Sequence, residues 1–488
     1  MARFFLLQAL LAALPLVSAT IKKSDATVIC EDIDSKISSA SDVIFPIQAL
    51  SFASATNHWY FSSSQTPACV LQVGSVADLS TAMKVIGASR TPFAIMSGGH
   101  ASNPGFSSTT GVHISLSRMD QVVLSPDNKI AEIGVGNHWS DVFKKLEGTG
   151  YNVVGGRTLG PGVGGFTLGG GYSWKTNQFG LTCDTVKSFN LVLPNGTFTK
   201  VSATQNPDLF FALKGGMNRF GVVTSVELYT HEQSPQVYGG IAIYPGSSVN
   251  ALINATSRFF YENTDPRAAV ITTLEAGVAG TTALALFFYD GPEKPASFKL
   301  FDGITPILNS ARKQTFSDFV AGIPAPLSQL RNPRGTFITL STSELTQRFV
   351  EAVKAETDAI SEVMALHSGT VASYDIEPFT PYGQYATDSA YPHESSPLPL
   401  NLYFAWVLES EDEWWHNKMR ESIATLRQVA IEEGIYTDST HFPSYPNYAI
   451  TGTPAEELYG PRNAARLRVI RDRVDPDRIM ELAGGFEI

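Results

Sequence analysis

Residues 155–171 read GGRTLGPGVGGFTLGGG, and nine of these 17 residues are glycine. The 40 glycines among 488 residues would place between one and two in a stretch of this length. Because a glycine costs about 0.5–1 kcal/mol in a regular element, this density indicates backbone that adopts positive φ or lies against a ligand. A flexible linker is the alternative, but linkers favour polar spacers, whereas Val163, Phe166 and Leu168 alternate with these glycines. The stretch is therefore predicted to bind a ligand.

Part of this stretch matches the dinucleotide-binding pattern GxGxxG. The match covers Gly160 to Gly165, and Asp184 follows 19 residues after the last glycine. That fingerprint needs a helix directly after it, whereas Gly169-Gly170-Gly171 would break such a helix. A nicotinamide dehydrogenase is therefore the weaker interpretation. A cradle of backbone N–H groups that binds a pyrophosphate is the stronger one.

The segments on either side of residues 155–171 alternate between helix and strand patterns. Ser75-Val76-Ala77-Asp78 is a capping box that opens a helix. An apolar strand at 91–96 runs into the glycine turn Ser97-Gly98-Gly99-His100. Asn195-Gly196 lies between two apolar runs and is typical of a type I′ hairpin turn. Further strands are expected at 113–116, 130–134, 189–193 and 220–228, and helices at 140–146 and 208–216.

The pattern changes after about residue 235, which predicts a second domain. Longer helices alternate there with apolar strands, as in an antiparallel sheet backed by helices, so the fold class is α+β. Near the end of the chain Thr453 is expected to cap a helix with Pro454 at its first position. The strands of the second domain are expected at 237–244, 269–274, 283–288 and 402–407, and its helices at 345–364 and 413–432.

Composition and charge limit the partners. Hydrophobic residues make up 43% of the chain and charged residues 17%, which excludes a disordered scaffold. A net charge of -11 argues against a nucleic acid or an anionic membrane as partner and favours a small-molecule substrate. The nine histidines show no HxxxH or HxH spacing, and three cysteines cannot form a metal framework, so no metal is expected. The sequence does not indicate an oligomeric state.

The first 19 residues have the pattern of a secretory signal peptide, which predicts an extracellular protein. Arg3 precedes an apolar run from Phe4 to Val17, and small residues follow up to Ala19. A membrane anchor is the alternative, but this run of 14 residues is shorter than the roughly 20 that a spanning helix needs. Disulfides persist in secreted proteins.

In a secreted protein the cysteines can form a disulfide and the two sequons can be glycosylated. A bridge from Cys30 to Cys69 would pin the mature N-terminus to the first core segment, although pairings with Cys183 stay open. Asn195 and Asn254 each stand in an Asn-x-Thr sequon, so the protein is predicted to be a glycoprotein. At Asn195 the hairpin turn is an equally good interpretation.

Four motifs, in order along the chain, resemble those of berberine-bridge-enzyme-like flavoproteins in the vanillyl-alcohol-oxidase group, which have the para-cresol-methylhydroxylase-type FAD-binding fold. The motifs are Ser97 to His100, the block 155–171, the segment from Asp208 to Thr224, and Tyr445-Pro446-Asn447-Tyr448. The resemblance implies a two-part FAD-binding domain of residues 20–235 and 441–488. Residues 236–440 would form the substrate-binding domain.

The resemblance also implies the cofactor site. The histidine at the position of His100 is attached covalently to the 8α-methyl group of FAD in this family. Thr158 stands where many members have a cysteine for a second bond, so a single attachment is expected. Pro161 lies where similar proteins have a residue near the flavin face that meets O2, which favours O2 as electron acceptor. The residues expected to bind FAD are Ser97, Gly98, Gly99, His100, Gly162, Gly164, Gly165, Gly170, Gly171, Val223 and Asn447.

Tyr445 is the predicted catalytic base. Similar enzymes place a tyrosine of a Tyr-x-Asn motif over the flavin, and a desolvated phenol with a lowered pKa could accept the proton that a substrate O–H or N–H loses. The sequence thus predicts a secreted FAD oxidase that moves a hydride from a C–H bearing O or N to flavin N5 and makes H2O2. Carbohydrates and secondary-metabolite alcohols or amines are the substrate candidates. A dehydrogenase with another acceptor and an inactive flavin-binding glycoprotein are the alternatives.

Overall fold

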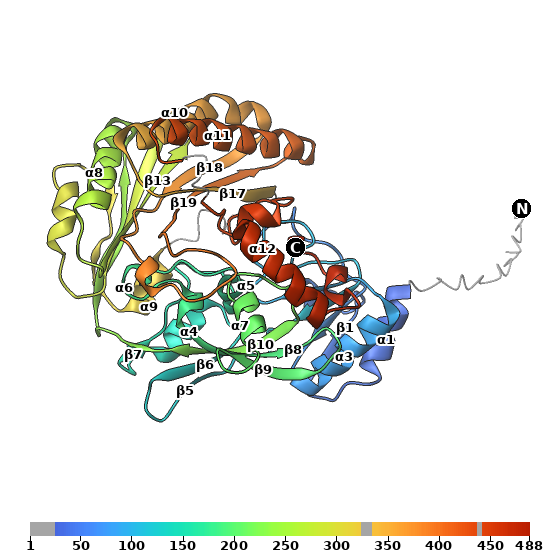
Figure 1. Cartoon of the computed structure of the whole chain (residues 1–488). Helices are drawn as coiled ribbons and strands as arrows, with labels where there is room; N and C mark the ends of the chain where they lie inside the picture. Colours follow the sequence, from blue (N-terminus) through green and yellow to red (C-terminus); the bar gives the residue numbers. More distant parts are fainter. Residues whose placement is uncertain (1–24, 324–333, 437–441) are drawn as a thin grey trace, which may run out of the picture.

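The structure, a computed structural model, describes residues 25–323, 334–436 and 442–488. The predicted signal peptide lies outside these residues. Two lobes pack against each other, with the first half of the chain and the C-terminal helix in one lobe and a large sheet with its helices in the other (Figure 1). No helix of the described residues has the length and apolarity to cross a membrane.

The first lobe contains two sheets. One has the order β1-β2-β4-β3, in which β2, β4 and β3 run parallel. Ser75 caps the helix α3 by accepting the N–H of Asp78, which confirms the predicted N-cap. The reciprocal half of the capping box does not form, because the Asp78 carboxylate accepts the hydroxyls of Ser38, Ser41 and Ser75 instead. Leu79, Met83 and Ile86 on that helix are fully buried. The elements are α1 (Asp25–Asp34), β1 (Asp42–Ile44), α2 (Ala49–Ala55), β2 (Cys69–Gln72), α3 (Val76–Ser89), β3 (Phe93–Met96) and β4 (Val112–Ser115).

The second sheet of this lobe is antiparallel, with the order β5-β6-β10-β8-β9, and a short pair β7–β11 lies beside it. Its strands are β5 (Val122–Leu124), β6 (Ile130–Gly134), β7 (Tyr151–Asn152), β8 (Val186–Val192), β9 (Phe198–Ser202), β10 (Val222–Tyr229) and β11 (His231–Glu232). Helices α4 (Trp139–Leu146), α5 (Val163–Leu168), α6 (Thr176–Phe179) and α7 (Pro207–Leu213) connect them.

The second lobe is built on one large antiparallel sheet, as the sequence predicted. Its order is β15-β12-β14-β13-β18-β19-β17, and β16 pairs with β12. The strands are β12 (Val237–Tyr244), β13 (Ala268–Ala276), β14 (Thr282–Tyr289), β15 (Leu308–Asn309), β16 (Arg312–Gln314), β17 (Arg334–Thr342), β18 (Gly369–Ile376) and β19 (Leu398–Trp406). The predicted domain boundary near 235 falls between β11 and β12.

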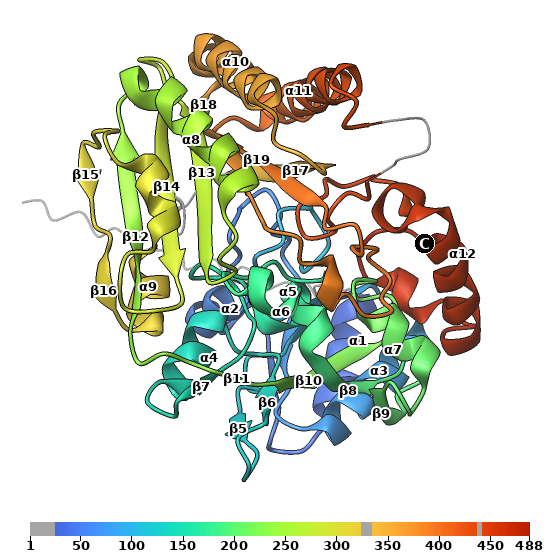
Figure 2. The same ribbon diagram turned by 60° about the vertical axis from the view of Figure 1, so that its left-hand side comes forward.

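The three long helices of this lobe cover one face of the large sheet. α8 (Val249–Glu262), α10 (Gln347–Val363) and α11 (Asp412–Glu432) pack on the face turned away from the first lobe (Figure 2). The short helix α9 (Phe316–Gly322) packs on the other face, against Gly239 of β12 and Phe288 of β14, and leaves the rest of that face uncovered by helices among the described residues. α12 (Ala455–Val474) contacts α7 and so returns the chain to the first lobe. The uncovered face of the sheet therefore looks towards the glycine-rich turns of the first lobe.

Three local predictions were wrong. Residues 163–168 form a short helix inside the glycine-rich block, where the glycines were expected to prevent one. The turn at Asn195 is not type I′, because Gly196 has positive φ and Asn195 does not; Leu193 N–H donates to the Thr197 carbonyl, which leaves a three-residue loop. Thr453 does not cap α12, since its hydroxyl donates to the Ile450 carbonyl and the helix starts one residue later than expected.

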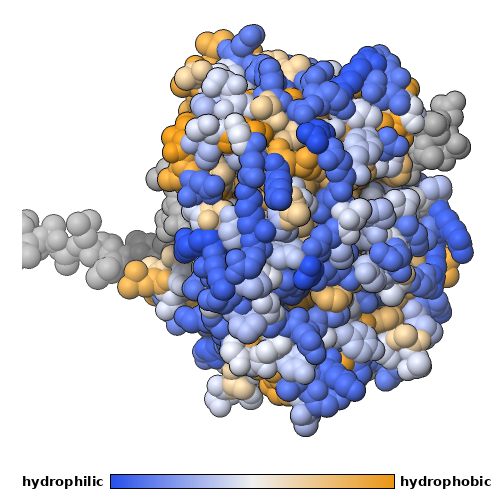
Figure 3. Space-filling view, turned by 90° about the vertical axis from the view of Figure 1, so that its left-hand side faces the viewer, coloured by the Kyte–Doolittle hydropathy of each residue, from blue (hydrophilic) through white to orange (hydrophobic). Residues whose placement is uncertain are grey.

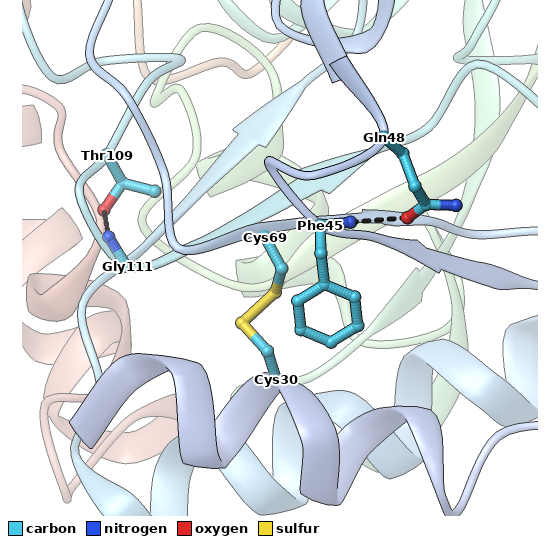
Figure 4. The surroundings of a disulfide bond; sticks show 6 residues. All are labelled: Cys30, Phe45, Gln48, Cys69, Thr109 and Gly111. Carbon is cyan, nitrogen blue, oxygen red and sulfur yellow. Dashed lines mark hydrogen bonds between the residues drawn. A yellow bond between two sulfur atoms is a disulfide. The ribbon is translucent and has the colours of Figure 1, made fainter. Parts of the chain in front are cut away.

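A disulfide joins Cys30 on α1 to Cys69 on β2, which is the pairing that the sequence favoured (Figure 4). Both cysteines are fully buried, and Cys183 is a buried free thiol. The bridge spans 39 residues of sequence and ties the first described helix to the parallel sheet. It therefore holds the start of the chain against the lobe that carries the glycine turns.

Replacing both Cys30 and Cys69 by alanine is expected to lower the free energy of unfolding by about 3–4 kcal/mol, because the bridge restricts a loop of this length in the unfolded chain. Denaturant unfolding with and without a thiol reductant checks this. The reductant should destabilise the natural protein and leave the double variant unchanged. A natural protein that is insensitive to reductant under denaturing conditions would contradict the bridge.

Candidate active site

A cavity of about 730 Å³ lies between the glycine turns of the first lobe and the uncovered face of the large sheet. The turn from Ser97 to Asn103 and residues of the block 155–171 form its floor, and the loop from Tyr445 to Tyr448 borders it. Strands of the large sheet form its roof. Segments far apart in sequence thus meet at one site, as expected of a ligand pocket between lobes.

The floor depends on a close approach of two backbones. A Cβ built on Gly98 would lie 2.5 Å from Gly162 N, and a Cβ on Gly162 would lie 2.2 Å from Gly98 N. Any side chain at either position would therefore push the two turns apart. Ser97 joins them as well, because its hydroxyl accepts the N–H of Gly164 and donates to the Val135 carbonyl.

Nine of the residues predicted to bind the cofactor line this cavity: Ser97, Gly98, Gly99, His100, Gly162, Gly164, Gly165, Val223 and Asn447. Thr158 and Pro161 line it too. Gly170 and Gly171 do not. Both have positive φ, and a Cβ on Gly171 would meet Phe166 and Thr182 at 2.7–2.8 Å, so these two glycines serve local packing next to Tyr445.

His100 offers an unused nitrogen to the cavity. Its Nε2 is buried and has no hydrogen-bond partner among the described residues, and its ring lies 4.0 Å from the Trp59 ring, centroid to centroid. Burial, aided by the charge of His138, lowers the pKa of His100 to about 4. The imidazole is therefore neutral at pH 7, and its Nε2 contacts no hydrogen-bonding group of the described residues.

Tyr445 lies in a nest of donors. Its hydroxyl oxygen accepts the N–H groups of Gly171 at 3.1 Å and Tyr172 at 3.3 Å and the side-chain amide of Asn447 at 2.8 Å. These donors favour a phenolate, but burial outweighs them and raises the pKa of Tyr445 to about 12. The expected lowering of this pKa was therefore wrong, because desolvation of the phenol exceeds the gain from three neutral donors.

Asp375 on β18 is a second acid–base group, which the sequence analysis missed. Its carboxylate lines the cavity and accepts hydrogen bonds from the Thr273 hydroxyl at 2.7 Å and the Asn401 amide at 2.9 Å. Burial, with a smaller contribution from Glu377, raises the pKa of Asp375 to about 6. The available signal was a carboxylate between Tyr374 and Ile376 near the end of this strand.

A buried ion pair ties the glycine-rich block to the large-sheet lobe beside Asp375. Arg157 donates two hydrogen bonds to Glu377, at 2.5 and 3.0 Å, and a third to the hydroxyl of Tyr448 at 2.5 Å. The side chains of Arg157 and Glu377 are 9% and 1% exposed, so each is the compensating charge for the other. The pair fixes the block against the strand end that follows Asp375.

Comparison with known proteins agrees with this geometry. Residues 67–202 match the family model described as FAD binding domain. An FAD-dependent monooxygenase of Cochliobolus heterostrophus, tpcD, is 30% identical over 448 residues, which cover 87% of this chain and 85% of that protein. An uncharacterized FAD-linked oxidoreductase of Arthroderma benhamiae is 37% identical over 264 residues, and that match spans only 53% of each chain. The chain belongs to the FAD-linked oxidoreductases.

Solved structures show the same fold at low sequence identity. The 6-hydroxy-D-nicotine oxidase of Arthrobacter nicotinovorans has a TM-score of 0.76 and 20% identity and covers 92% of this chain and 98% of its own. BBE-like 1 of Physcomitrella patens has a TM-score of 0.75 and 17% identity, with 92% and 97% covered. The resemblance to berberine-bridge-enzyme-like flavoproteins, and the α+β fold with it, are thus confirmed.

The residues of this FAD-linked oxidoreductase fit its cofactor. The cavity floor presents glycines whose missing side chains leave room for a ligand against the backbone, and a Cβ on Gly165 would meet no protein atom within 4 Å. The neutral His100 nitrogen without a partner faces the same space. Ser97 to His100 and the first turn of α5 are therefore the segments that would hold FAD.

Gly165→Ala separates cofactor binding from folding. Since the new methyl group meets no protein atom and alanine favours a helix, the apo protein should be as stable as the natural one or slightly more so. The flavin content per protein, measured by absorbance, should fall because the methyl group occupies cofactor space. Gly98→Ala is the matched comparison, and it should lower the unfolding midpoint itself. Full flavin content in Gly165→Ala would place the cofactor elsewhere.

Proposed function

We propose that this FAD-linked oxidoreductase is an oxidase that removes a hydride from a substrate carbon bearing O or N. One observation supports the proposal: the glycine floor, His100, Tyr445 and Asp375 all line the same cavity. The Nε2 atom of His100 has no hydrogen-bond partner there among the described residues. FAD, when bound, would accept the hydride at N5 and return two electrons to O2, which becomes H2O2. Carbohydrates and secondary-metabolite alcohols or amines carry such a bond.

The protein groups must take the proton that the substrate O–H or N–H releases. Tyr445 is the predicted acceptor, and its three donors stabilise the phenolate that would form. Asp375 is the second candidate, favoured by its pKa of about 6, because a base is most effective when its pKa lies near the working pH. A phenol whose pKa is about 12 is a weak candidate for a base that acts alone at pH 7, which favours a part for Asp375 in the same cavity.

We also propose that FAD is attached through His100 alone. The neutral buried nitrogen of His100 supports this, as does Thr158, which offers no thiol for a second bond. Attachment forms one N–C bond and releases two hydrogens, as two protons and two electrons, which O2 can accept. A covalent cofactor cannot be lost by dilution, which suits an extracellular enzyme.

Secretion and glycosylation belong to the same proposal. The disulfide between Cys30 and Cys69 suits an oxidising compartment. Asn195 and Asn254 are both exposed, so both sequons are open to modification. Pro161 on the cavity floor supports O2 as the electron acceptor by the resemblance noted above.

Acid precipitation tests the cofactor assignment. Flavin absorbance should stay with the precipitated polypeptide of the natural protein and appear in the supernatant of His100→Ala. The physical reason is that denaturation releases every non-covalent ligand but not a carbon–nitrogen bond. Flavin in the supernatant of the natural protein would refute covalent attachment, and a protein without flavin would refute the proposed function.

The pH dependence of anaerobic flavin reduction, followed by stopped-flow absorbance, assigns the base. A base works when deprotonated, so the rate should rise with pH through the Asp375 pKa of about 6 and then level off. Asp375→Asn should abolish this rise near pH 6 and slow flavin reduction at pH 7 by about 10²–10⁴-fold. Tyr445→Phe should also slow flavin reduction by orders of magnitude, but its reduction rate should still rise with pH near pH 6. If Asp375→Asn reduces flavin at the natural rate, that residue has no part in proton transfer.

A further inference from the structure

The register of the strands shows which residues of the cavity roof lie side by side. Cross-strand partners place Thr273 beside Asp375 on one side and beside Leu284 on the other, and Ile243 then pairs with Leu284 and with Leu308. With neighbouring strands about 4.8 Å apart, Leu308 lies about 19 Å from Asp375 across four strand steps. One row of the sheet therefore runs from the acid–base centre to the sheet edge.

The character of this row changes along its length. Around Asp375 the roof is polar, with Thr273, Ser373 and Asn401 lining the cavity. Towards β12 and β15 it becomes aliphatic. We call these aliphatic residues the shelf; all of them line the cavity, and they are Ile241, Ile243, Ile271, Leu284, Leu286 and Leu308.

The shelf opens to solvent at the sheet edge. Ile241 and Leu286 are each 8% exposed, whereas Ile243 is 39% and Leu308 52% exposed. Figure 3 shows hydrophobic side chains interspersed with hydrophilic ones on one face of the molecule. Aliphatic groups at the open end of a pocket are stabilised when a ligand covers them.

The charged side chains that line the cavity indicate which ligand charge it can accept. Glu275 and Asp375 line it, and the Glu275 carboxylate makes no hydrogen bond or ion pair within the described part of the chain. Arg157 is the one lysine or arginine in the described lining, and its guanidinium is engaged by Glu377 and Tyr448. Among the described lining residues an anionic ligand would thus meet two carboxylates and no free lysine or arginine.

We propose that the substrate is an elongated molecule with a hydrocarbon-rich body and a neutral or cationic reacting end, and that the shelf binds this body. This inference rests on the proposed function, because the reacting end must lie near Asp375 and the cofactor. The aliphatic side chains of the shelf offer no hydrogen bond, so an oligosaccharide lying there would lose its hydration without replacement. Among the candidate substrates the geometry points to alcohols or amines with apolar bodies.

A set of probes that differ only in the end group tests this proposal: 1-decanol, decylamine and decanoate, with cellotetraose as the carbohydrate. Binding to the flavin-bearing protein is measured by the perturbation of its visible absorbance and by the shift in its unfolding midpoint, below micellar concentrations. Decanol and decylamine should bind, decanoate at least tenfold more weakly, and cellotetraose should give no shift at the same concentrations.

Variants locate the binding surface. Ile243→Gln combined with Leu308→Gln replaces the two most exposed shelf residues, so the fold should tolerate it, and decanol affinity should fall by about tenfold or more. Leu284→Gln tests the deeper part. Ile307→Gln is the matched control, because Ile307 neighbours Leu308, is 71% exposed and does not line the cavity, and it should bind decanol as the natural protein does.

Two results would overturn the proposal: cellotetraose binding more tightly than decanol, or unchanged decanol affinity in the double shelf variant. Either is distinguishable from failure of the proposed function. The absence of flavin is seen in the absorbance spectrum before any probe is added, and the unfolding midpoint still reports probe binding in such a protein.

Discussion

The approach of Gly98 to Gly162 is the constraint on which the site depends. A side chain on either glycine would come within about 2.5 Å of the other backbone, so the two turns can meet only because both lack a Cβ. Their contact sets the floor of the cavity and places His100, two residues after Gly98, beside the glycine-rich block. Glycines lose more conformational entropy on folding than other residues do. This loss lowers the stability of the protein and is the consequence of a cavity floor made of backbone without side chains.

The roof must be held above that floor, and buried charges do this. Arg157 reaches from the glycine-rich block to Glu377 beyond β18. On the other side Asp184 pairs at 2.8 Å with His393, whose second ring nitrogen contacts the Tyr391 carbonyl. The Asp184 carboxylate raises the pKa of His393, although burial alone would lower it. Such pairs fix the relative position of the lobes more sharply than apolar contacts do.

Local patterns predicted those features that local physics determines. The Ser75 N-cap, the strand that ends at Met96 and the alternation of the second lobe needed only periodicity and turn chemistry. The short helix at Val163–Leu168 was not predicted, because glycines argue against a helix unless tertiary contacts hold the backbone, as Ser97 does here. Asp375 was missed for a related reason: its partners Thr273 and Asn401 come from neighbouring strands, and strand register cannot be read from one sequence.

The register also explains why acid–base chemistry and ligand selectivity lie on the same sheet without conflict. Alternate residues of each strand face the cavity, so Asp375 on β18 and the aliphatic side chains of β12 and β14 occupy different strands of one surface, with β13 between them. The first lobe provides the floor and the second lobe the roof, and exchanging the aliphatic residues of β12 and β14 would leave Asp375 and its partners on β13 and β19 in place. A fold arranged in this way can change the ligand body that it accepts while it keeps the chemistry that it performs.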